Sequence, residues 1–396
     1  MQKLWLKKNE DRRIRAGHLW VFSNEVDTAK SPLTAFAPGE AASLHDWRGV
    51  CLGSVCVSPA ALICARLHSR KAGVELDEAL IHTRLQNALA LRQSLFHEPW
   101  YRLCHSEGDF LPGLVVDRYG DHLTLQIGTA GMERRKESIV AALSALLGHT
   151  SLYFDNDLGV RGLENLSRQP ESRGNLPESL VVPENGCHFR VPVAGGQKTG
   201  WFYDQRCNRQ DFARHAQGQD VLDIFSYAGG FGVYAAAAGA RFVTFLDASA
   251  PALELARHNA AANAPNLAAA DAISSLCGDA FQLLAELAAQ GRRFGLISLD
   301  PPAFIKRRKD MAQGLAAYRK VNLLAMRLLR PGGILVSSSC SHHLTAEALR
   351  TCVAQAAARL GLHGRLLGSG SQGPDHPVHA SMPETAYLKC VTLQAS

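Results

Sequence analysis

The sequence predicts an α/β protein whose C-terminal part is a doubly wound, Rossmann-like parallel sheet, preceded by a small mixed-β domain and an α+β central domain. Strands alternate with helical patterns beyond Gln210, whereas short apolar runs separated by turn residues fill the N-terminal part. The chain has 396 residues, more than one hydrophobic core usually organises. We therefore expect three domains, at 1–75, 76–185 and 186–396.

The N-terminal 75 residues contain short strands with hairpin-like turns at PGE and DWRG. Basic residues crowd an early segment that also contains tryptophans, which is typical of a solvated face and equally of a nucleic-acid contact. The nearby aromatic side chains favour the second interpretation. The residues we predict to contact RNA here are Lys7, Arg12, Arg13 and Trp20.

The central domain is predicted to contain two helices and several strands. Apolar residues at three- and four-residue spacing predict a helix over Asp77 to Leu95 and a second near Met132 to Leu147. The stretch SEGDFLPGLVVDRYGDHLTLQI reads as strands separated by turns. Glu164 to Glu178 lacks apolar periodicity and predicts a loop before the final domain.

In the final domain, strands and helices alternate. Its predicted elements are VLDIF, a helix over Val233 to Ala238, FVTFLD, a helix over Pro251 to Asn263, a strand near Ser275 to Leu276, a helix over Phe281 to Ala289, GLISLD, a helix over Gly314 to Leu329, and GGILVSSS. Helices of about 10 to 15 residues between apolar strands are typical of a parallel sheet with crossover connections.

The composition excludes several classes of protein. Hydrophobic residues make up 46% and charged residues 20%, as in ordinary globular proteins. No run approaches the ~18 apolar residues of a membrane span, and the N-terminus lacks the apolar segment of a signal peptide, so we expect a cytoplasmic protein with no membrane partner. The missing signal peptide predicts that the ten cysteines are reduced thiols, mostly in the core, and the lack of a C-x-x-C pair predicts no metal site. The net charge of +6 weakly favours polyanionic partners.

The stretch VLDIFSYAGGFG, Val221 to Gly232, places small residues directly after a buried strand. Such residues allow the main chain to approach a ligand closely, and a nucleotide-like cofactor is the obvious candidate. The dinucleotide pattern G-x-G-x-x-G is absent from this stretch, which disfavours a nicotinamide dehydrogenase. The glycines alone are weak evidence.

Three aspartates at the ends of predicted strands make the glycine stretch a more specific signal of a cofactor site. Asp247 closes FVTFLD, Asp279 follows the next strand, and Asp300 closes GLISLD before two prolines. Ligands of such sheets bind at the carboxyl ends of the strands. Each acid alone is also typical of a helix N-cap. Together the landmarks resemble those of class I S-adenosylmethionine-dependent methyltransferases. The resemblance implies that Asp247 binds the ribose hydroxyls and that Asp279 lies near the adenine.

The stretch DPPAF resembles the fourth motif of nucleic-acid base methyltransferases, and Ala303 after the prolines disfavours methylation of adenine N6. The strand GGILVSSSC brings Cys340 to the same sheet edge. Cytosine C5 is a poor nucleophile until a thiolate adds at C6, so Cys340 is our candidate nucleophile, and Asp300 would grip the base edge. No base for the C5 proton is identified, since His342 and His343 are more typical of exposed loop residues.

The motifs continue along almost the whole chain and resemble those of the bacterial 23S ribosomal RNA large-subunit methyltransferase I family. RAGHLWVFSNEV and PGEAASLHDWRG are similar to its PUA domain, and KTGWFYDQRCNR, SYAGGFG, DPPAF, SSSCS and DHPVHASMPETAYLK to its catalytic part. The resemblance implies S-adenosylmethionine as cofactor, Cys340 as nucleophile and a site near the cofactor. The residues implied there are Tyr203, Asp204, Gln205, Phe225, Ser226, Tyr227, Gly229, Asp247, Asp279, Asp300 and Pro301. Trp201 to Tyr203 and Ala303 depart from the family pattern.

The implied partner is 23S ribosomal RNA or a large-subunit precursor, and a homodimer is left open. The basic run Lys306, Arg307, Arg308 and Lys309 extends from the DPPAF loop and is predicted to hold phosphates around a flipped-out base. A solvated loop is the alternative. Two other functions remain open: a ribosomal RNA guanine methyltransferase without a covalent step, and a nonenzymatic RNA-binding factor for ribosome assembly.

Overall fold

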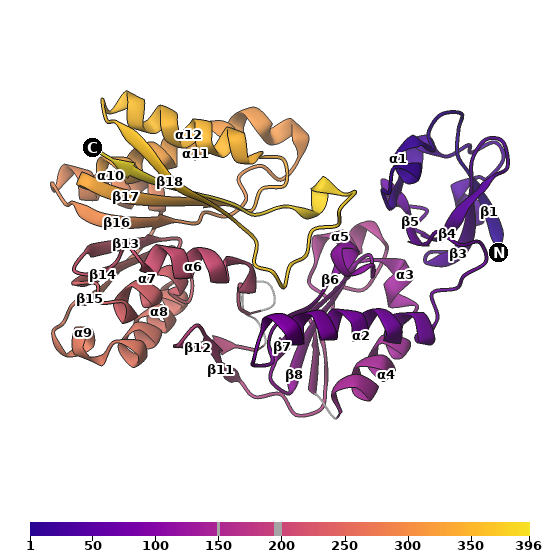
Figure 1. The fold of residues 1–396 in the computed structure, drawn as a ribbon, viewed down its shortest axis with the longest axis horizontal. Helices are drawn as coiled ribbons and strands as arrows, with labels where there is room; N and C mark the ends of the chain where they lie inside the picture. Colours follow the sequence, from indigo (N-terminus) through magenta and orange to yellow (C-terminus); the bar gives the residue numbers. More distant parts are fainter. Residues whose placement is uncertain (149–150, 194–199) are drawn as a thin grey trace. The chain divides into compact units, whose positions relative to one another are not determined.

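Figure 1 shows the fold in a computed structural model, which describes residues 1–148, 151–193 and 200–396. The chain forms two compact units. The first contains Met1–Ser179, Pro192–Tyr203 and Pro374–Thr385, and the second contains Leu180–Val191, Asp204–Gly373 and Ala386–Ser396. The predicted three-domain division stays a prediction. Residue 185 lies in the turn between β11 (Ser179–Glu184) and β12 (Cys187–Pro192), which pair with each other.

The N-terminal part of the first unit is a five-stranded sheet of order β1-β3-β4-β5-β2. Its elements are β1 (Gln2–Trp5), α1 (Arg12–Arg15), β2 (Trp20–Phe22), β3 (Glu40–His45), β4 (Cys51–Val57) and β5 (Ile63–Ser69). The predicted turn at DWRG is confirmed, since Gly49 donates its N–H to the carbonyl of Asp46 at 3.0 Å. Met382 from the far end of the chain packs into the core of this sheet and is fully buried.

The second sheet of this unit has the order β10-β9-β8-β7-β6. Its elements are α2 (Glu78–Leu95), β6 (Trp100–His105), β7 (Leu114–Tyr119), β8 (His122–Ile127), α3 (Ala130–Glu133), α4 (Lys136–Leu147), β9 (Ser151–Phe154), α5 (Gly159–Leu163) and β10 (Glu171–Arg173). The helix predicted over Asp77 to Leu95 is confirmed as α2. Asp77 caps it by accepting a hydrogen bond from the N–H of Leu80 at 2.9 Å.

Two predictions for this sheet are confirmed only in part. The helix expected near Met132 to Leu147 is two helices, because Arg135 leaves the helical conformation at φ −109° and ψ 14°. Its guanidinium reaches the carbonyls of Leu76 and Gly39 at 3.0 Å each. The loop expected over Glu164 to Glu178 contains β10, a short edge strand antiparallel to β9, which the sequence pattern of a short exposed strand does not reveal.

The second unit is built on a seven-stranded sheet of order β15-β14-β13-β16-β17-β19-β18. The strands are β13 (Asp220–Ile224), β14 (Phe242–Asp247), β15 (Ile273–Cys277), β16 (Phe294–Leu299), β17 (Leu329–Ser339), β18 (Gly364–Ser371) and β19 (Lys389–Ala395). Strands β13 to β17 are parallel, and β19 is antiparallel to both of its neighbours. The predicted doubly wound sheet is confirmed, and its order reverses between β13 and β16, where such sheets bind ligands.

Helices cover both faces of this sheet, with α6, α7 and α8 on one side and α10, α11 and α12 on the other (Figure 1). The helices are α6 (Arg206–Ala213), α7 (Gly230–Ala237), α8 (Ala250–Asn263), α9 (Pro265–Ala269), α10 (Ala280–Ala289), α11 (Met311–Arg327) and α12 (Ala346–Arg359). All predicted helices of this part are confirmed, with ends shifted by up to three residues. The sequence analysis did not predict α12, β18 and β19.

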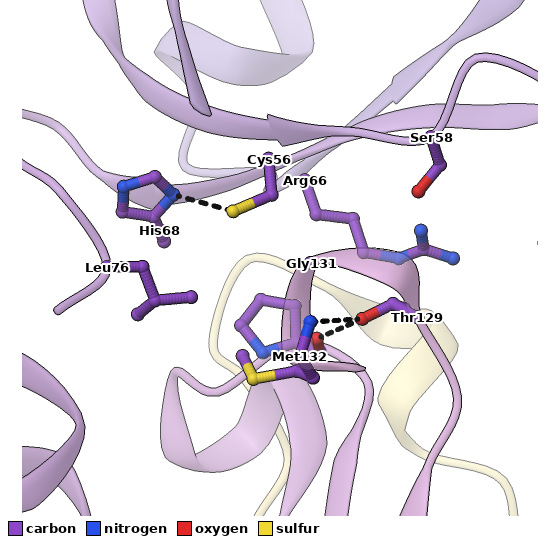
Figure 2. A pocket seen from close by; sticks show the side chains of 9 residues that line it. Cys56, Ser58, Arg66, His68, Leu76, Thr129, Gly131 and Met132 are labelled. Atoms are coloured by element: carbon purple, nitrogen blue, oxygen red, sulfur yellow. Dashed lines mark hydrogen bonds between the residues drawn. The ribbon is translucent and has the colours of Figure 1, made fainter. Parts of the chain in front are cut away.

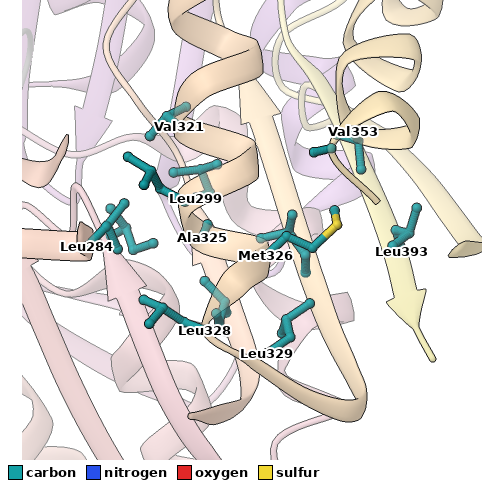
Figure 3. Packing of buried hydrophobic residues seen from close by; sticks show 14 of the residues in the cluster. Leu284, Leu299, Val321, Ala325, Met326, Leu328, Leu329, Val353 and Leu393 are labelled. Carbon is teal, nitrogen blue, oxygen red and sulfur yellow. The ribbon is translucent and has the colours of Figure 1, made fainter. Parts of the chain in front are cut away.

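The main core of the second unit lies under α10, α11 and α12. Figure 3 shows Leu284, Val321 and Met326 from these helices meeting Leu299 and Leu393 from the sheet. Each of these side chains is at most 5% exposed. Shortening a buried leucine of this kind to alanine costs ~2–5 kcal/mol, so this layer holds β16, β17 and β19 in register.

Six of the ten cysteines are buried, which confirms that most of them are core residues. Within the described ranges, no helix combines the length and apolarity needed to cross a bilayer. The same residues contain no group of three or more His, Cys, Asp or Glu side chains arranged to hold a metal ion.

Candidate active site

The first half of the candidate site is the loop between β13 and α7. Phe225 and Ser226 donate their backbone N–H groups to the carbonyl of Leu246 on β14, at 2.8 and 3.2 Å. Phe225 and Tyr227 adopt left-handed backbone conformations, with φ of 62° and 47°. Such conformations cost ~1–3 kcal/mol each and persist where the surrounding structure enforces them, often next to a ligand. The loop is therefore strained and held in place by β14.

The structure shows why glycines are needed in this loop, which the sequence alone did not reveal. Gly229 precedes α7 with φ of 84°. A Cβ on Gly232 would lie 2.2 Å from Cε1 of the Phe245 ring, and one on Gly229 would lie 3.0 Å from Cβ of Ala256. The space beside these two glycines is thus filled by the protein's own side chains, and the glycines allow α7 to pack against β14.

Asp223 lies on β13, the strand that leads into this loop, and was not among the predicted site residues. Its Oδ2 accepts a hydrogen bond from the N–H of Gly232 at 2.8 Å, and its Oδ1 accepts one from the Ser298 hydroxyl at 2.5 Å. Burial raises the pKa of Asp223 to about 7, and the charges of Asp300 and Asp247 act in the same direction. The sequence signal for Asp223 is a single carboxylate within the apolar strand VLDIF.

Asp247 ends β14 and is 9% exposed. Its Oδ2 accepts a hydrogen bond from the N–H of Tyr227, and its Oδ1 accepts one from the N–H of Ser249, both at 2.9 Å. The carboxylate therefore fixes the strained loop and the turn into α8 together. Each carboxylate oxygen has a second lone pair, so hydroxyl groups of a ribose can be bound in addition.

Ser226 gives a test of whether this loop fits a polar cofactor. Its side chain is 6% exposed, and in the part of the chain that the structure describes its Oγ has no hydrogen-bond partner. Leaving a buried hydroxyl unsatisfied costs ~1–3 kcal/mol. A bound polar group would remove that cost, so Ser226 and Asp247 together suit the amino-acid and ribose parts of S-adenosylmethionine.

Asp279 is exposed and is the N-cap of α10, where it accepts a hydrogen bond from the N–H of Gln282 at 3.0 Å. The helix-capping interpretation is therefore confirmed. The contact of Asp279 with adenine stays a prediction, because a cap uses only part of the hydrogen-bonding capacity of a carboxylate.

The second half of the site begins at Asp300, directly after β16. Asp300 donates its N–H to the carbonyl of Ile224 at the end of β13, at 3.4 Å. Pro301 is buried and Pro302 is exposed. Further along the loop, Ile305 donates its N–H to Oγ of Ser341 at 3.3 Å. The Asp-Pro-Pro loop is thus bound to the residue that follows Cys340.

Cys340 comes directly after β17, at the carboxyl edge of the sheet, and is partly exposed. The hydroxyl of Ser339 donates to the hydroxyl of Tyr318 at 2.7 Å, and Tyr318 and Ser341 share a hydrogen bond of 2.8 Å. Ser341 also donates its N–H to Oγ of Ser339 at 3.2 Å. This hydroxyl cluster, Tyr318, Ser339 and Ser341, fixes the backbone on both sides of Cys340.

Sequence analysis missed two residues of this half, Tyr318 on α11 and Lys389 at the start of β19. Tyr318 is fully buried and Lys389 is 7% exposed. The ammonium of Lys389 donates to the carbonyls of Ser341 and Tyr387 at 2.6 and 2.7 Å. Two local signals could have pointed to Lys389: it is a single lysine in the apolar run YLKCVTL, and it ends the family-like stretch DHPVHASMPETAYLK. Nothing local pointed to Tyr318.

Tyr203, Asp204 and Gln205 form a short 3₁₀ turn. The buried Tyr203 belongs to the first unit and donates its hydroxyl to the carbonyl of Arg118 at 3.0 Å. Asp204 accepts a hydrogen bond from the hydroxyl of Tyr387 at 2.6 Å. Gln205 accepts one from Asn208 at 2.6 Å. Their closure over a cofactor stays a prediction, and Lys198 at the start of the predicted segment lies outside the described residues.

The predicted RNA-contacting residues of the first unit differ in their surroundings. Lys7 and Arg12 are exposed, although the ammonium of Lys7 donates to the carbonyl of Asn24 at 2.8 Å. Arg13 forms an ion pair with Glu25 at 2.7 Å, and the indole N–H of Trp20 donates to Glu107 at 2.7 Å. Arg13 and Trp20 are thus engaged in contacts within the protein.

The basic run after the Asp-Pro-Pro loop is exposed along its length, at Lys306, Arg307, Arg308 and Lys309. Arg307 forms an ion pair with Asp310 at 3.2 Å. Such an exposed pair contributes little to stability, so the run keeps its capacity to bind phosphates.

The first unit also contains a basic groove of about 440 Å³ that sequence analysis did not identify. Arg70, Lys71 and Arg84 line it, next to Phe110 and His379. Phe110 is 54% exposed, has φ of 61°, and its ring contacts that of His379 at 5.4 Å. Cations beside an exposed aromatic ring suit single-stranded nucleic acid, where phosphates and bases are bound together.

A second hollow of this unit is small, about 10 Å³. Figure 2 shows Cys56 pointing toward the His68 ring, with Sγ 3.7 Å from Nδ1, above Thr129 and Met132. Burial lowers the pKa of His68 to about 4. The space holds about one water molecule, so it is a packing feature and not a substrate site.

Comparison with known proteins identifies the family. A family model described as S-adenosylmethionine-dependent methyltransferase matches residues 168–383, and one described as PUA-like domain matches residues 4–70. Ribosomal RNA large subunit methyltransferase I of Tolumonas auensis is 37% identical over 99% of both chains, and that of Cronobacter sakazakii is 36% identical over 98% of both.

Solved structures agree with the fold. A methyltransferase crystallised with SAH has a TM-score of 0.83 at 21% identity, covering 100% of both chains. A SAM-dependent methyltransferase from Streptococcus mutans has a TM-score of 0.82 at the same identity and coverage. With a PUA-like domain before a domain that uses S-adenosylmethionine, the chain belongs to the ribosomal RNA large subunit methyltransferase I family.

Proposed function

We propose that this protein methylates ribosomal RNA of the large subunit with S-adenosylmethionine, and that it forms 5-methylcytosine in 23S RNA through a covalent bond between Cys340 and C6 of the base. One observation carries the proposal: a partly exposed thiol, Cys340, ends β17 at the sheet edge where Asp300 also lies. The names of the relatives that are 37% and 36% identical over nearly the full chain support the RNA substrate.

The chemistry follows from the low reactivity of cytosine C5. The Cys340 thiolate adds to C6, and the electron pair of the C5–C6 double bond makes C5 nucleophilic. C5 then takes the methyl group of S-adenosylmethionine, whose S–CH3 bond breaks with its electron pair remaining on the cofactor sulfur. Loss of the C5 proton to a base returns an electron pair that reforms the double bond, and the S–C6 bond breaks to release the thiolate. The net change replaces a hydrogen on C5 by a methyl group and releases one proton.

Asp300 is proposed to hold the base. Its carboxyl group can accept a hydrogen bond from the N4 amino group and stabilise a proton at N3, which neutralises the charge that develops as sulfur adds. The Ile305 N–H binds the Asp-Pro-Pro loop to Ser341. The segment that carries the acid is therefore connected to the segment that carries the nucleophile. The base has to leave the helical stack to reach them.

The cofactor supplies an electrophilic methyl group carried by a sulfonium ion. Ser226 and the loop through Phe225, Tyr227 and Gly229 are proposed to bind its amino-acid part, with Asp247 on the ribose and Asp279 near the adenine. Two features of the loop support this: the buried Ser226 hydroxyl, and the backbone that Asp247 fixes. Carboxylates at this edge also favour a positively charged sulfonium.

RNA is proposed to contact both units. In the second unit the contact is the run from Lys306 to Lys309, and in the first unit it is the basic groove with Arg70, Lys71 and Phe110. Both combine exposed cations with positions where a phosphate backbone can lie, which predicts RNA binding that weakens as salt increases.

The test is a methylation assay with purified protein, unmethylated large-subunit RNA and S-adenosylmethionine, followed by mass-spectrometric mapping of the modified nucleotide. The expected product is 5-methylcytosine in 23S RNA. Methylguanosine as the product would exclude the C5 reaction while leaving methyl transfer intact. A protein that binds no S-adenosylmethionine in calorimetry and leaves the RNA unmodified would exclude the enzymatic function altogether.

A further inference from the structure

Lys389 occupies an unusual place for a cation. It begins β19, where antiparallel pairing places it opposite Ser339 of β17, the residue before Cys340. Its side chain is almost fully buried, at 7% exposure. Burying an ammonium ion is costly unless nearby groups compensate for the lost water.

Two carbonyl oxygens provide part of that compensation. The Nζ of Lys389 donates to the carbonyl of Ser341 at 2.6 Å and to that of Tyr387 at 2.7 Å. One of these carbonyls belongs to the residue directly after Cys340. An ammonium ion has three N–H donors, so these two hydrogen bonds leave one donor that is not used by a carbonyl.

A negative charge on the Cys340 sulfur interacts with the Lys389 ammonium ion. Burial lowers the pKa of Lys389 to about 8, and the interaction with a negative charge on Cys340 opposes that shift. Interaction between two charges is mutual, so a positive charge on Lys389 favours the thiolate form of Cys340 by the same amount. Low-pKa cysteines in other proteins depend on such cationic neighbours.

Of the described groups on the elements next to this thiol, two more are kept neutral by burial. The Tyr318 hydroxyl on α11 is kept neutral, since burial raises its pKa. Cys390 on β19 is also neutral, because burial raises the pKa of its thiol to about 12. A carboxylate at Asp300, directly after β16, would oppose a thiolate. His342 is exposed, and its ring contacts that of Tyr387 at 5.6 Å.

We propose that Lys389 is a positioning residue that holds a positive charge beside the Cys340 sulfur and so keeps it as a thiolate, ready to attack an electron-poor pyrimidine ring. The proposal rests on Cys340 being the nucleophile of the proposed function. The thiol proton leaves to solvent, the ammonium remains protonated, and no other group changes its charge.

The experiment measures how the reaction of Cys340 with iodoacetamide depends on pH, by mass spectrometry of the Cys340 peptide. The protein itself provides the control, because Cys207 and Cys277 are exposed and are alkylated in the same sample. We expect Cys340 to react with a midpoint ~1 pH unit or more below that of these two cysteines. A midpoint equal to theirs or higher overturns the proposal, and this comparison needs no variant.

Variants sharpen the result. In Lys389→Met we expect the midpoint of Cys340 to rise by ~1 pH unit, with those of Cys207 and Cys277 unchanged. Lys389→Arg keeps the charge and is expected to restore the low midpoint. A Lys389→Met protein that is folded, binds S-adenosylmethionine normally and keeps the wild-type midpoint contradicts the proposal, because a merely structural lysine would give that result.

The outcome is separable from that of the proposed function. If Cys340 has a low midpoint that depends on Lys389 but Cys340→Ala still methylates RNA, the electrostatic role of Lys389 stands and the covalent mechanism fails.

Discussion

The two halves of the sheet edge are held by different chemistry. In the half formed by β13 and β14, the carboxylates of Asp223 and Asp247 accept hydrogen bonds from backbone N–H groups of the loop. In the half formed by β17 and β19, side-chain hydroxyls fix the backbone around Cys340, and Lys389 binds two carbonyls beside it.

The difference indicates how each half responds to substitution. Carboxylate bonds to the backbone determine the conformation of the cofactor loop, so changes in the first half should alter stability and cofactor affinity. The hydroxyl cluster and Lys389 act on one thiol and its neighbours. Changes in the second half should therefore alter turnover and leave cofactor affinity intact.

The largest expected effect is on the pH dependence of stability. Asp223 has a folded-state pKa of about 7, raised by burial from its ordinary value. Its stabilising contribution is complete below about pH 4 and is lost as pH rises through about 7, because the unfolded chain releases the proton first. Between pH 5 and pH 7.5 wild type should lose ~2.5 kcal/mol more stability than Asp223→Asn in urea unfolding. Parallel pH profiles would contradict this.

Gly232→Ala tests the packing of the cofactor half. The added Cβ would lie 2.2 Å from the Phe245 ring, which is fully buried, so we expect a destabilisation of ~2–3 kcal/mol. Gly368→Ala on β18 is the matched control, since a Cβ there meets nothing within 4 Å and should change stability by less than ~0.5 kcal/mol. Equal stability of the two variants would refute the packing argument.

Asp247→Ala removes the acceptor for the N–H groups of Tyr227 and Ser249 together with the proposed ribose contact. We expect S-adenosylmethionine to bind ~50-fold more weakly, equivalent to ~2.3 kcal/mol, as measured by calorimetry. Asp211→Ala is a control, because Asp211 is exposed and forms an ion pair at 3.0 Å with its helix neighbour Arg214. Unchanged affinity in Asp247→Ala would remove Asp247 from the cofactor site.

Tyr318→Phe gives the smallest expected effect and tests the other half. The variant loses the hydrogen bonds to Ser339 and Ser341 while keeping the buried ring. We expect kcat to fall ~10-fold, equivalent to ~1.4 kcal/mol, because the backbone around Cys340 is less well fixed, with the affinity for S-adenosylmethionine unchanged. A loss of cofactor affinity in this variant would show that the two halves are not separate.

Sequence analysis predicted best the residues that have local signals, and these residues lie in both halves. Asp247, Asp300 and Cys340 each end a strand of the parallel sheet, and strand ends can be recognised from the apolar runs before them. Asp223 was missed because its carboxylate lies inside a strand, where the pattern predicts burial and gives no chemical role.

The missed residues around Cys340 depend on contacts between distant parts of the sequence. Lys389 faces Ser339 only because β19 returns antiparallel to β17, and the chain between β18 and β19 passes through the first unit, at Pro374–Thr385. In that segment Asp375 accepts a hydrogen bond from the N–H of Arg102 at 3.0 Å. No turn signal predicts such an excursion, so the pairing and the residues that it brings to Cys340 could not be predicted from the sequence.

The central claim is that the Cys340 sulfur bonds to the pyrimidine ring during methylation. RNA containing 5-fluorocytosine tests it directly, because fluorine cannot leave as a proton does and the S–C6 bond persists after methyl transfer. The account predicts a covalent complex whose RNA is attached to the Cys340 peptide, and no complex with Cys340→Ala. A Cys340→Ala protein that makes 5-methylcytosine at the wild-type rate would contradict it.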